Sequence, residues 1–157
     1  TTQNMPGTVK SQGLELISKW IANDFINFGL NYTYTSTYDG AEQDDPDKNS
    51  SYTNSQMVRV PRHLLNIGAN YNISDSTIIR WKTKWSDTAR DYGNTNNGFA
   101  DVILDDNITF DYVGSYNLYD TYNLFFSVKN IFDQNYEQAY QYSTMDRSYN
   151  FGIRRRF

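Results

Sequence analysis

The sequence predicts an all-β protein of the antiparallel transmembrane β-barrel class. Seven segments alternate apolar and polar residues with a period of two, as antiparallel strands with one wet face do. Aromatic residues make up 17% of the chain, although hydrophobic residues reach only 38% and the mean hydropathy is -0.74. Aromatic side chains interleaved with Asn, Thr and Ser suit strands that face lipid on one side and water on the other.

The predicted strands follow one another along the whole chain. They comprise residues 12–20, 26–35, 64–71, 78–86, 107–112, 122–130 and 147–157. Most approach the ~10 residues that a tilted membrane strand needs, whereas strands of soluble proteins average roughly 5–6. A soluble β-sandwich shows the same alternation, and the strand length favours the membrane barrel over it.

Each predicted strand has one apolar or aromatic face. In chain order, these faces carry Leu14, Leu16 and Trp20; Ile26, Phe28, Leu30, Tyr32 and Tyr34; Leu65, Ile67, Ala69 and Tyr71; Ile79, Trp81 and Trp85; Ile108, Phe110 and Tyr112; Tyr122, Leu124, Phe126 and Val128; and Tyr149, Phe151, Ile153, Arg155 and Phe157. The opposite faces are polar and include Glu15, Lys19, Arg80, Lys82, Lys84 and Lys129. In a barrel, the polar faces line the lumen.

Two charged residues, Asp106 and Arg155, fall on the apolar side of their strands. A charge at the bilayer midplane costs ~2–4 kcal/mol, and this cost falls to ~0–1 kcal/mol near the interface. We expect Arg155 to reach the headgroups from its strand end. Asp106 requires a bulge or a position near the outer rim.

The connections between the predicted strands alternate between short and long. Short ones lie at 22–25, 72–76 and 117–120, and long polar ones lie at 38–57, 88–101 and 133–146. Outer-membrane barrels have short periplasmic turns and longer extracellular loops, so all short connections are expected on the periplasmic side. Aromatic residues stand near those strand ends, as an interfacial girdle would: Trp20, Phe25, Tyr71, Tyr112, Tyr122 and Phe157.

The composition argues against several other classes of protein. The net charge of -4 disfavours a general nucleic-acid binder, and the absence of cysteine removes disulfides and thiolate metal sites. His63 is the only histidine, and nothing in the spacing pairs it with a nucleophile and an orienting acid, as in an outer-membrane phospholipase. We therefore expect neither an enzyme nor a cofactor.

The first long connection contains a candidate calcium site. Asp45, Asp47 and Asn49 have the spacing of the first EF-hand ligands, but Ser50 stands where that loop needs glycine and Gln56 where it needs glutamate. The segment is not an EF-hand. A looser calcium site and a solvated loop are the remaining alternatives.

Five stretches of the chain resemble the C-terminal part of TonB-dependent outer-membrane receptors. The segment "VKNIFDQNYE" at 128–137 is close to that family's Asn-Leu-Phe-Asp-x-x-Tyr signature. The other four are residues 6–16, 30–35, 59–71 and 146–157. The resemblance implies a barrel of about 22 strands, of which residues 1–157 would be the C-terminal segment with the last seven. It also implies a plug domain and a TonB-contacting segment, neither of which is in this chain.

The resemblance implies energised uptake of a scarce metal chelate across the outer membrane of a Gram-negative bacterium. The implied partners are outer-membrane lipid, the TonB complex through the missing N-terminal part, the barrel assembly machinery and a small-molecule metal chelate, but no nucleic acid. In this family a plug fills the lumen, so the charged polar faces would contact plug residues or water. A passive porin or an adhesin barrel without a plug is the alternative.

Two sets of candidate site residues follow from the last long connection and the last strand. Tyr136, Tyr140 and Tyr142 offer flat apolar surfaces with polar tips, which suit a bulky ligand. Their segment resembles the vitamin B12 (cobalamin) receptor subgroup, with matches at Tyr140, Tyr142, Thr144 and Arg147 and departures at Gln141, Met145 and Asp146. Iron–siderophore and haem receptors are the alternatives to cobalamin.

The last strand resembles the signal that the barrel assembly machinery reads. The residues of this signal would be Tyr149, Phe151, Gly152, Ile153 and Phe157. Physically, the signal is a strand edge that adds to another sheet. Arg155 departs from the aromatic or apolar residue that the family has two places before its end. An ordinary strand that stops at an interfacial Phe is the alternative.

Overall fold

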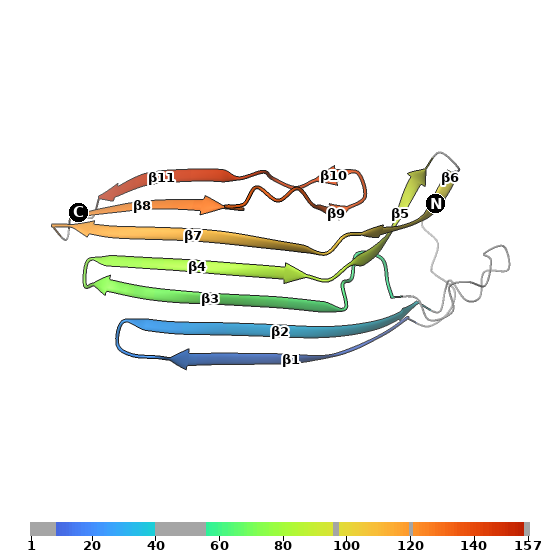
Figure 1. Ribbon diagram of the computed structural model, residues 1–157, viewed down its shortest axis with the longest axis horizontal. Helices are drawn as coiled ribbons and strands as arrows, with labels where there is room; N and C mark the ends of the chain where they lie inside the picture. Colours follow the sequence, from blue (N-terminus) through green and yellow to red (C-terminus); the bar gives the residue numbers. More distant parts are fainter. Residues whose placement is uncertain (1–8, 40–55, 96–97, 120, 156–157) are drawn as a thin grey trace.

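The computed structural model describes residues 9–39, 56–95, 98–119 and 121–155, and its elements are β-strands. They are β1 (Val9–Ile21), β2 (Ile26–Asp39), β3 (His63–Ser74), β4 (Thr77–Ser86), β5 (Ala89–Thr95), β6 (Gly98–Leu104), β7 (Asn107–Leu118), β8 (Tyr122–Lys129), β9 (Glu137–Ala139), β10 (Tyr142–Ser143) and β11 (Ser148–Arg155). Seven of them form one antiparallel sheet in the order β1-β2-β3-β4-β7-β8-β11 (Figure 1). These seven are the predicted strands, so the all-β prediction is confirmed. Within the described residues, no helix is long and apolar enough to cross a membrane.

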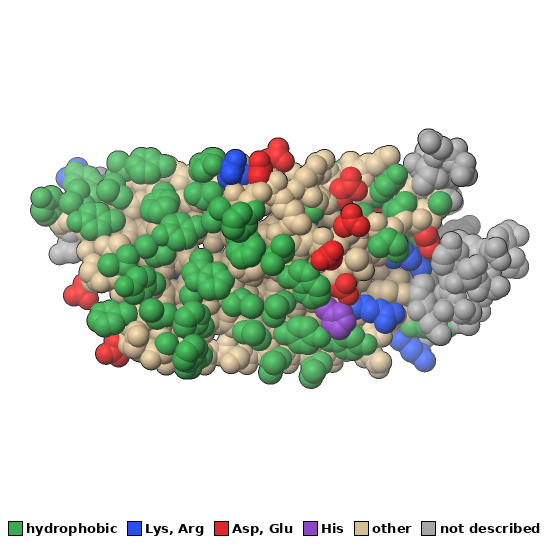
Figure 2. All heavy atoms as spheres, viewed as in Figure 1, with side chains coloured by type: hydrophobic (Ala, Val, Ile, Leu, Met, Phe, Trp, Pro, Cys, Tyr) green, Lys and Arg blue, Asp and Glu red, His purple; other side chains and the backbone are tan. Residues whose placement is uncertain are grey.

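Each long strand pairs with its neighbours along the chain, and the register keeps like residues on one face. Trp20 lies opposite Phe28, and their rings stack with centroids 5.2 Å apart. The same row continues through Ala69 and Trp81 to Tyr112. Because successive side chains point to opposite sides of a sheet, the sheet has an apolar face, which carries this row, and a polar face. Figure 2 shows apolar side chains spread over the sheet, with a band of acidic side chains toward the long connections.

The apolar face has no second layer packed against it. The buried hydrophobic residues of the described chain are Ala69 and Leu104, whereas Leu14, Trp20 and Phe151 are 65%, 63% and 75% exposed. A β-sandwich would bury this face between two sheets about 10 Å apart. The arrangement is therefore that of a barrel wall, and it does not support the sandwich alternative.

The short connections lie at one end of the sheet and the long ones at the other, as predicted (Figure 1). We call these the turn end and the loop end. At the turn end, the Asn23 side-chain oxygen accepts hydrogen bonds from the backbone N–H groups of Phe25 and Ile26, at 2.8 and 2.9 Å. This bonding closes the hairpin between β1 and β2.

Two of the predicted long loops contain strands. β5 and β6 pair as a hairpin between β4 and β7, in the connection predicted at 88–101, although β6 continues beyond it to Leu104. β9 pairs with β10 within the connection predicted at 133–146. β5 is polar, β6 ends in an unbroken apolar run, and β9 and β10 have only 3 and 2 residues, so none shows the alternation that marked the sheet strands. The hairpins extend the wall at the loop end.

The predicted strand at 107–112 is too short. β7 extends to Leu118, so Tyr112 lies midway along it and not at the turn end. The alternation breaks at Gly114, which lies on the apolar face without a side chain. The ring of Phe126 on β8 covers Gly114 and restores the apolar surface there.

The two charged residues that the sequence places on the apolar side of their strands lie at strand ends. Asp106 precedes β7 at the loop end, where the Trp85 indole N–H donates to its carboxylate at 3.3 Å. Arg155 ends the described part of β11 and lies over the ring of Tyr122, 5.8 Å from its centroid. Both positions avoid the midplane, where the cost of a charge is greatest.

Consecutive phenylalanines on β8 cover glycines on opposite faces. Phe126 covers Gly114 on the apolar face, and Phe125 covers Gly152 of β11 on the polar face. A Cβ atom at Gly152 would overlap the Phe125 ring. This contact gives Gly152 a packing role that is separate from its role in the predicted assembly signal.

We expect Gly152→Val to lower the folded yield of the receptor, because overpacking costs typically about 1–3 kcal/mol. The measurement is the fraction that keeps the fast electrophoretic mobility of a folded barrel when it is not heated. Phe125→Ala in the same chain should restore this fraction, which a role in assembly alone would not predict. Asn150→Val is the control, because Asn150 lies on the same face of β11. Equal yields for Gly152→Val and the control would contradict the packing role.

Candidate functional site

The polar face is hollowed around a pair of glycines. Gly29 of β2 lies opposite Gly68 of β3, and the same row runs from Lys19 on β1 to Lys82 on β4 and Asp111 on β7. Because the two glycines have no side chains, the row has an open floor between the two lysines. The cavity above this floor has a volume of about 680 Å³. We call it the glycine-floored cavity.

Asparagines form the two sides of the glycine-floored cavity. On the side toward the turn end, the Asn70 amide donates to the Asn27 side-chain oxygen at 2.9 Å. On the side toward the loop end, Asn31 pairs in register with Asn66, and its amide donates to Glu15 at 2.7 Å. The asparagines therefore supply neutral hydrogen-bonding groups held on rigid strands, while Ile17 and Val113 on the same face also line the cavity.

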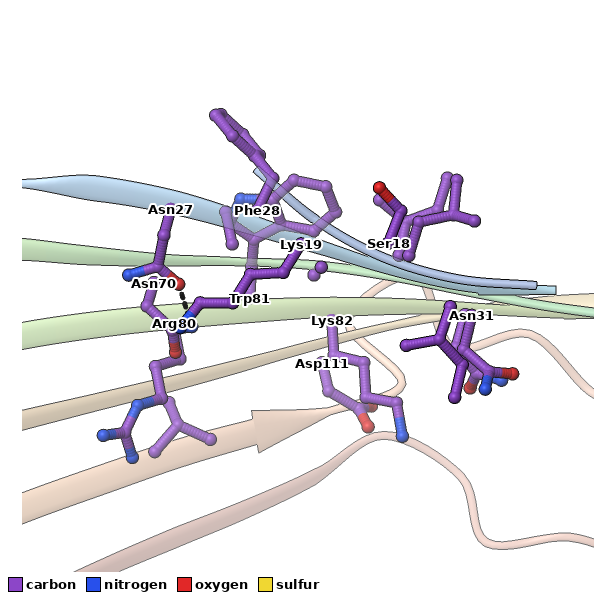
Figure 3. Close-up of a pocket in the computed structure, with 18 of the residues that line it drawn as sticks. Ser18, Lys19, Asn27, Phe28, Asn31, Asn70, Arg80, Trp81, Lys82 and Asp111 are labelled. Carbon is purple, nitrogen blue, oxygen red and sulfur yellow. Dashed lines mark hydrogen bonds between the residues drawn. The ribbon is translucent and has the colours of Figure 1, made fainter. Parts of the chain in front are cut away.

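Figure 3 shows how the labelled side chains divide between the faces. Asn31, Lys82 and Asp111 lie on one side of the sheet, whereas Phe28 and Ser18 lie on the other. With the register, this places the predicted polar faces of β1, β2, β3, β4 and β7 on one surface.

The glycine-floored cavity is strongly cationic. The charged residues that line it are Lys19, Arg80, Lys82, Lys129 and Asp111. Within the described part of the chain, no hydrogen bond or ion pair engages the side chains of the four cations, while Asp111 accepts from the Asn130 backbone N–H at 3.0 Å. Four cations against one carboxylate favour an anionic occupant.

A second cavity of about 210 Å³ continues the polar face toward the loop end. It shares Lys82, Asp111 and Lys129 with the glycine-floored cavity and adds Lys84. Tyr136 lines it too. The structure therefore brings one of the three predicted ligand-contacting tyrosines next to the polar-face lysines.

The other two predicted tyrosines lie elsewhere. The Tyr140 ring packs on Gly93 of β5, and its backbone N–H donates to Asp91 at 2.8 Å. Tyr142 on β10 is 73% exposed. The three tyrosines do not form one surface, and their role in ligand binding stays a prediction.

One carboxylate joins three segments at the loop end. Asp91 of β5 is 1% exposed and accepts both from the Arg59 guanidinium Nε, at 2.9 and 3.0 Å, and from the Tyr140 backbone N–H. Arg59 precedes β3 and has a φ of 61°, while Tyr140 lies between β9 and β10. Sequence reasoning did not find Asp91, because its partners are 32 and 49 residues away and no local pattern marks them.

The signature at 128–137 forms a tight turn after β8. The side chain of Asn130 accepts from the Gln134 N–H at 3.0 Å and donates to the Gln134 carbonyl at 2.9 Å. Asp133 accepts from the Arg147 backbone N–H at 2.7 Å. The stretch that most resembles the receptor family therefore fixes the connection between β8 and β11.

The remaining predicted site residues have structural partners or lie outside the described residues. His63 begins β3 and shares a 2.7 Å hydrogen bond with the Tyr32 hydroxyl. The calcium candidates, which lie outside the described residues, are Asp45, Asp47 and Asn49. Across the described ranges, no three His, Asp or Glu side chains gather as a metal site.

The predicted assembly residues lie on the free edge strand. Tyr149, Phe151 and Ile153 are 69%, 75% and 61% exposed. Gly152 lies under Phe125, and Phe157 is outside the described residues. Among the described strands β11 pairs with β8 alone, so its other backbone edge is open to another strand.

We expect Asp91→Asn to loosen the loop end without unfolding the sheet. It weakens a charged hydrogen-bond network, and hydrogen bonds to charged groups contribute about 1.5–3 kcal/mol when buried. Because the Arg59 side chain is 56% exposed, solvent screens the interaction, and the loss of stability should lie at or below the lower bound of that range. The measurement is the rate of tryptic cleavage at Arg59, which should rise several-fold. Asp105→Asn, at an exposed site of the same end, is the control, and equal cleavage rates would contradict this role.

Several solved structures share this fold, and three of them are receptors by name. The siderophore receptor PiuA from Acinetobacter baumannii matches 94% of this chain and 22% of its own at 22% identity, with a TM-score of 0.72. The ferripyoverdine receptor of Pseudomonas aeruginosa, bound to ferripyoverdine, matches 92% and 19% at 15% identity, with a TM-score of 0.73. The ferric yersiniabactin uptake receptor FyuA from Yersinia pestis matches 94% and 23% at 17% identity, with a TM-score of 0.65. The chain thus spans about a fifth of the length of these proteins.

Among curated proteins, no sequence matches the chain. A family model does match residues 1–131, and it is described as "TonB dependent receptor-like, beta-barrel". That match covers most of the chain, and the seven-stranded wall agrees with it. The chain belongs to the TonB-dependent receptor-like β-barrel family.

Proposed function

We propose that this chain is the last part of the barrel of a receptor that takes up a scarce metal chelate, of the ferric siderophore type, across the outer membrane. The family match over residues 1–131 carries this proposal. The siderophore receptors among the structures of the same fold support the iron chelate as the ligand class.

The two faces of the sheet suit the two sides of a barrel wall. The apolar face would contact lipid, and the polar face would line the lumen. The sheet is open in this chain, since β1 and β11 each have one paired edge. Unpaired edges are not tolerated in lipid, so function requires the remaining strands of the barrel.

The transport mechanism we propose involves no covalent chemistry. The receptor would bind its chelate from outside, and the TonB complex would then move a plug domain in the lumen. The polar face of this chain would be part of the wall along which the ligand passes. Differential binding and conformational change are sufficient for this role.

Cobalamin is the second candidate ligand. Its support is the sequence match at Tyr140, Tyr142, Thr144 and Arg147. In the structure, the Thr144 hydroxyl bonds the Tyr136 carbonyl at 2.9 Å, and Arg147 bonds Asp133 and the Ile131 carbonyl. These contacts account for both residues through the local turn, which weakens the match as support for a cobalamin site.

The terminal strand has a second proposed partner, the barrel assembly machinery. Its support is the exposed apolar row on β11, formed by Tyr149, Phe151 and Ile153. This edge would pair transiently with a strand of the machinery before it pairs with the first strand of its own barrel.

Uptake by cells that express the full-length receptor tests the function. We expect accumulation of radiolabelled iron supplied as a siderophore complex, because the family consists of transport receptors, and we expect a protonophore to abolish it. Accumulation that survives the protonophore would favour a passive porin. Accumulation of labelled cobalamin alone would favour the second candidate.

A further inference from the structure

The polar face contains a glycine that the fold does not require. A Cβ atom at Gly29 would meet nothing within 4 Å, and the φ of Gly29 is not in the left-handed region. Other residues therefore fit this position of β2 without strain. A glycine inside a strand often marks a place where a ligand or another backbone approaches closely.

The groups around Gly29 favour an anion. Lys19 and Lys82 stand at the two ends of the Gly29–Gly68 floor, and neither side chain has a hydrogen bond or ion pair in the described part of the chain. Ammonium groups without partners in a concave site attract anions and donate charge-assisted hydrogen bonds. The Asn66 amide, also without a side-chain partner among the described residues, adds neutral donors.

The charge along the polar face changes from the loop end inward. A cavity of about 320 Å³ at the loop end is lined by three carboxylates, Asp87, Asp105 and Glu137, and by two cations, Arg59 and Lys84. It shares Lys84 with the cavity of about 210 Å³ that lies between it and the glycine-floored cavity. That middle cavity in turn shares Lys82 with the glycine-floored cavity. Cations thus stand at both junctions, and they outnumber carboxylates most at the inner end. An anion gains the most favourable potential at the glycine-floored cavity.

We propose that the polar face is an anion pathway, and that the receptor's ligand is a metal chelate with negatively charged oxygens at its surface. Lys19 and Lys82 hold these oxygens across the Gly29–Gly68 floor during passage. The inference rests on the proposed function and narrows it, because a neutral chelate or neutral cobalamin gains little from these lysines.

Uptake by cells with the full-length receptor tests the proposal with probes of different charge. The probes are an anionic ferric tris-catecholate, anionic ferric citrate, a neutral ferric tris-hydroxamate and cyanocobalamin. We expect uptake of an anionic probe, and at least a tenfold loss of its apparent affinity in Lys19→Gln/Lys82→Gln. A tenfold change corresponds to about 1.4 kcal/mol, close to the lower bound of about 1.5 kcal/mol for one charged hydrogen bond. Lys10→Gln is the matched control, because Lys10 is on the same strand and on the opposite face.

A steric variant tests the floor separately. Gly29→Val fills the floor without a clash, so it should reduce uptake of the anionic probe severalfold at an unchanged amount of folded receptor. Thr35→Val, on the same face of β2 and outside the cavity, should not change uptake. Normal uptake by folded Gly29→Val would overturn the proposal.

The outcomes separate the two levels of the proposal. Preferred uptake of a neutral probe, or equal losses of neutral and anionic probes in the lysine variant, would overturn the anion pathway and leave the receptor function standing. Uptake of none of the four probes would contradict the proposed function itself, and the pathway with it.

Discussion

The continuous antiparallel hydrogen-bond ladder is the constraint on which the rest of this structure depends. Lipid offers no partners to backbone N–H and C=O groups, so each strand must pair with its neighbours over its full length. The ladder also fixes which face each side chain occupies. A slip of one residue between β2 and β3 would move Gly68 and Asn70 to the apolar face and Ala69 to the polar one.

The register places chemically distinct rows at successive heights of the wall. The row through Trp20 and Phe28 is apolar, and the adjacent row through Lys19 and Gly29 is polar, although the residues are neighbours in sequence. The same geometry lets Phe125 and Phe126 cover glycines on opposite faces. At the loop end, the Asp91 carboxylate joins three segments of the chain, so the wall supports an ordered loop end.

The sequence was sufficient to predict the sheet, because period-two alternation is a local signal. It predicted all seven strands and the separation of short turns from long connections. It missed the second half of β7, since Gly114 interrupts the alternation and its cover comes from Phe126 on another strand. It also missed Asp91 and the Gly29–Gly68 floor. Both depend on residues far apart in sequence, which only the register and the folded connections bring together.

The opposite environments of the two faces are the central claim, and site-directed spin labelling along β4 tests it most directly. The chain has no cysteine, so a label can be placed at one chosen position in it. In the full-length receptor in lipid, collisions with oxygen should peak at Ile79 and Trp81, and collisions with a water-soluble nickel chelate should peak at Arg80 and Lys82. A period of two with opposite phases for the two reagents would support the account. Equal accessibility at adjacent positions, or the reverse phase, would contradict it.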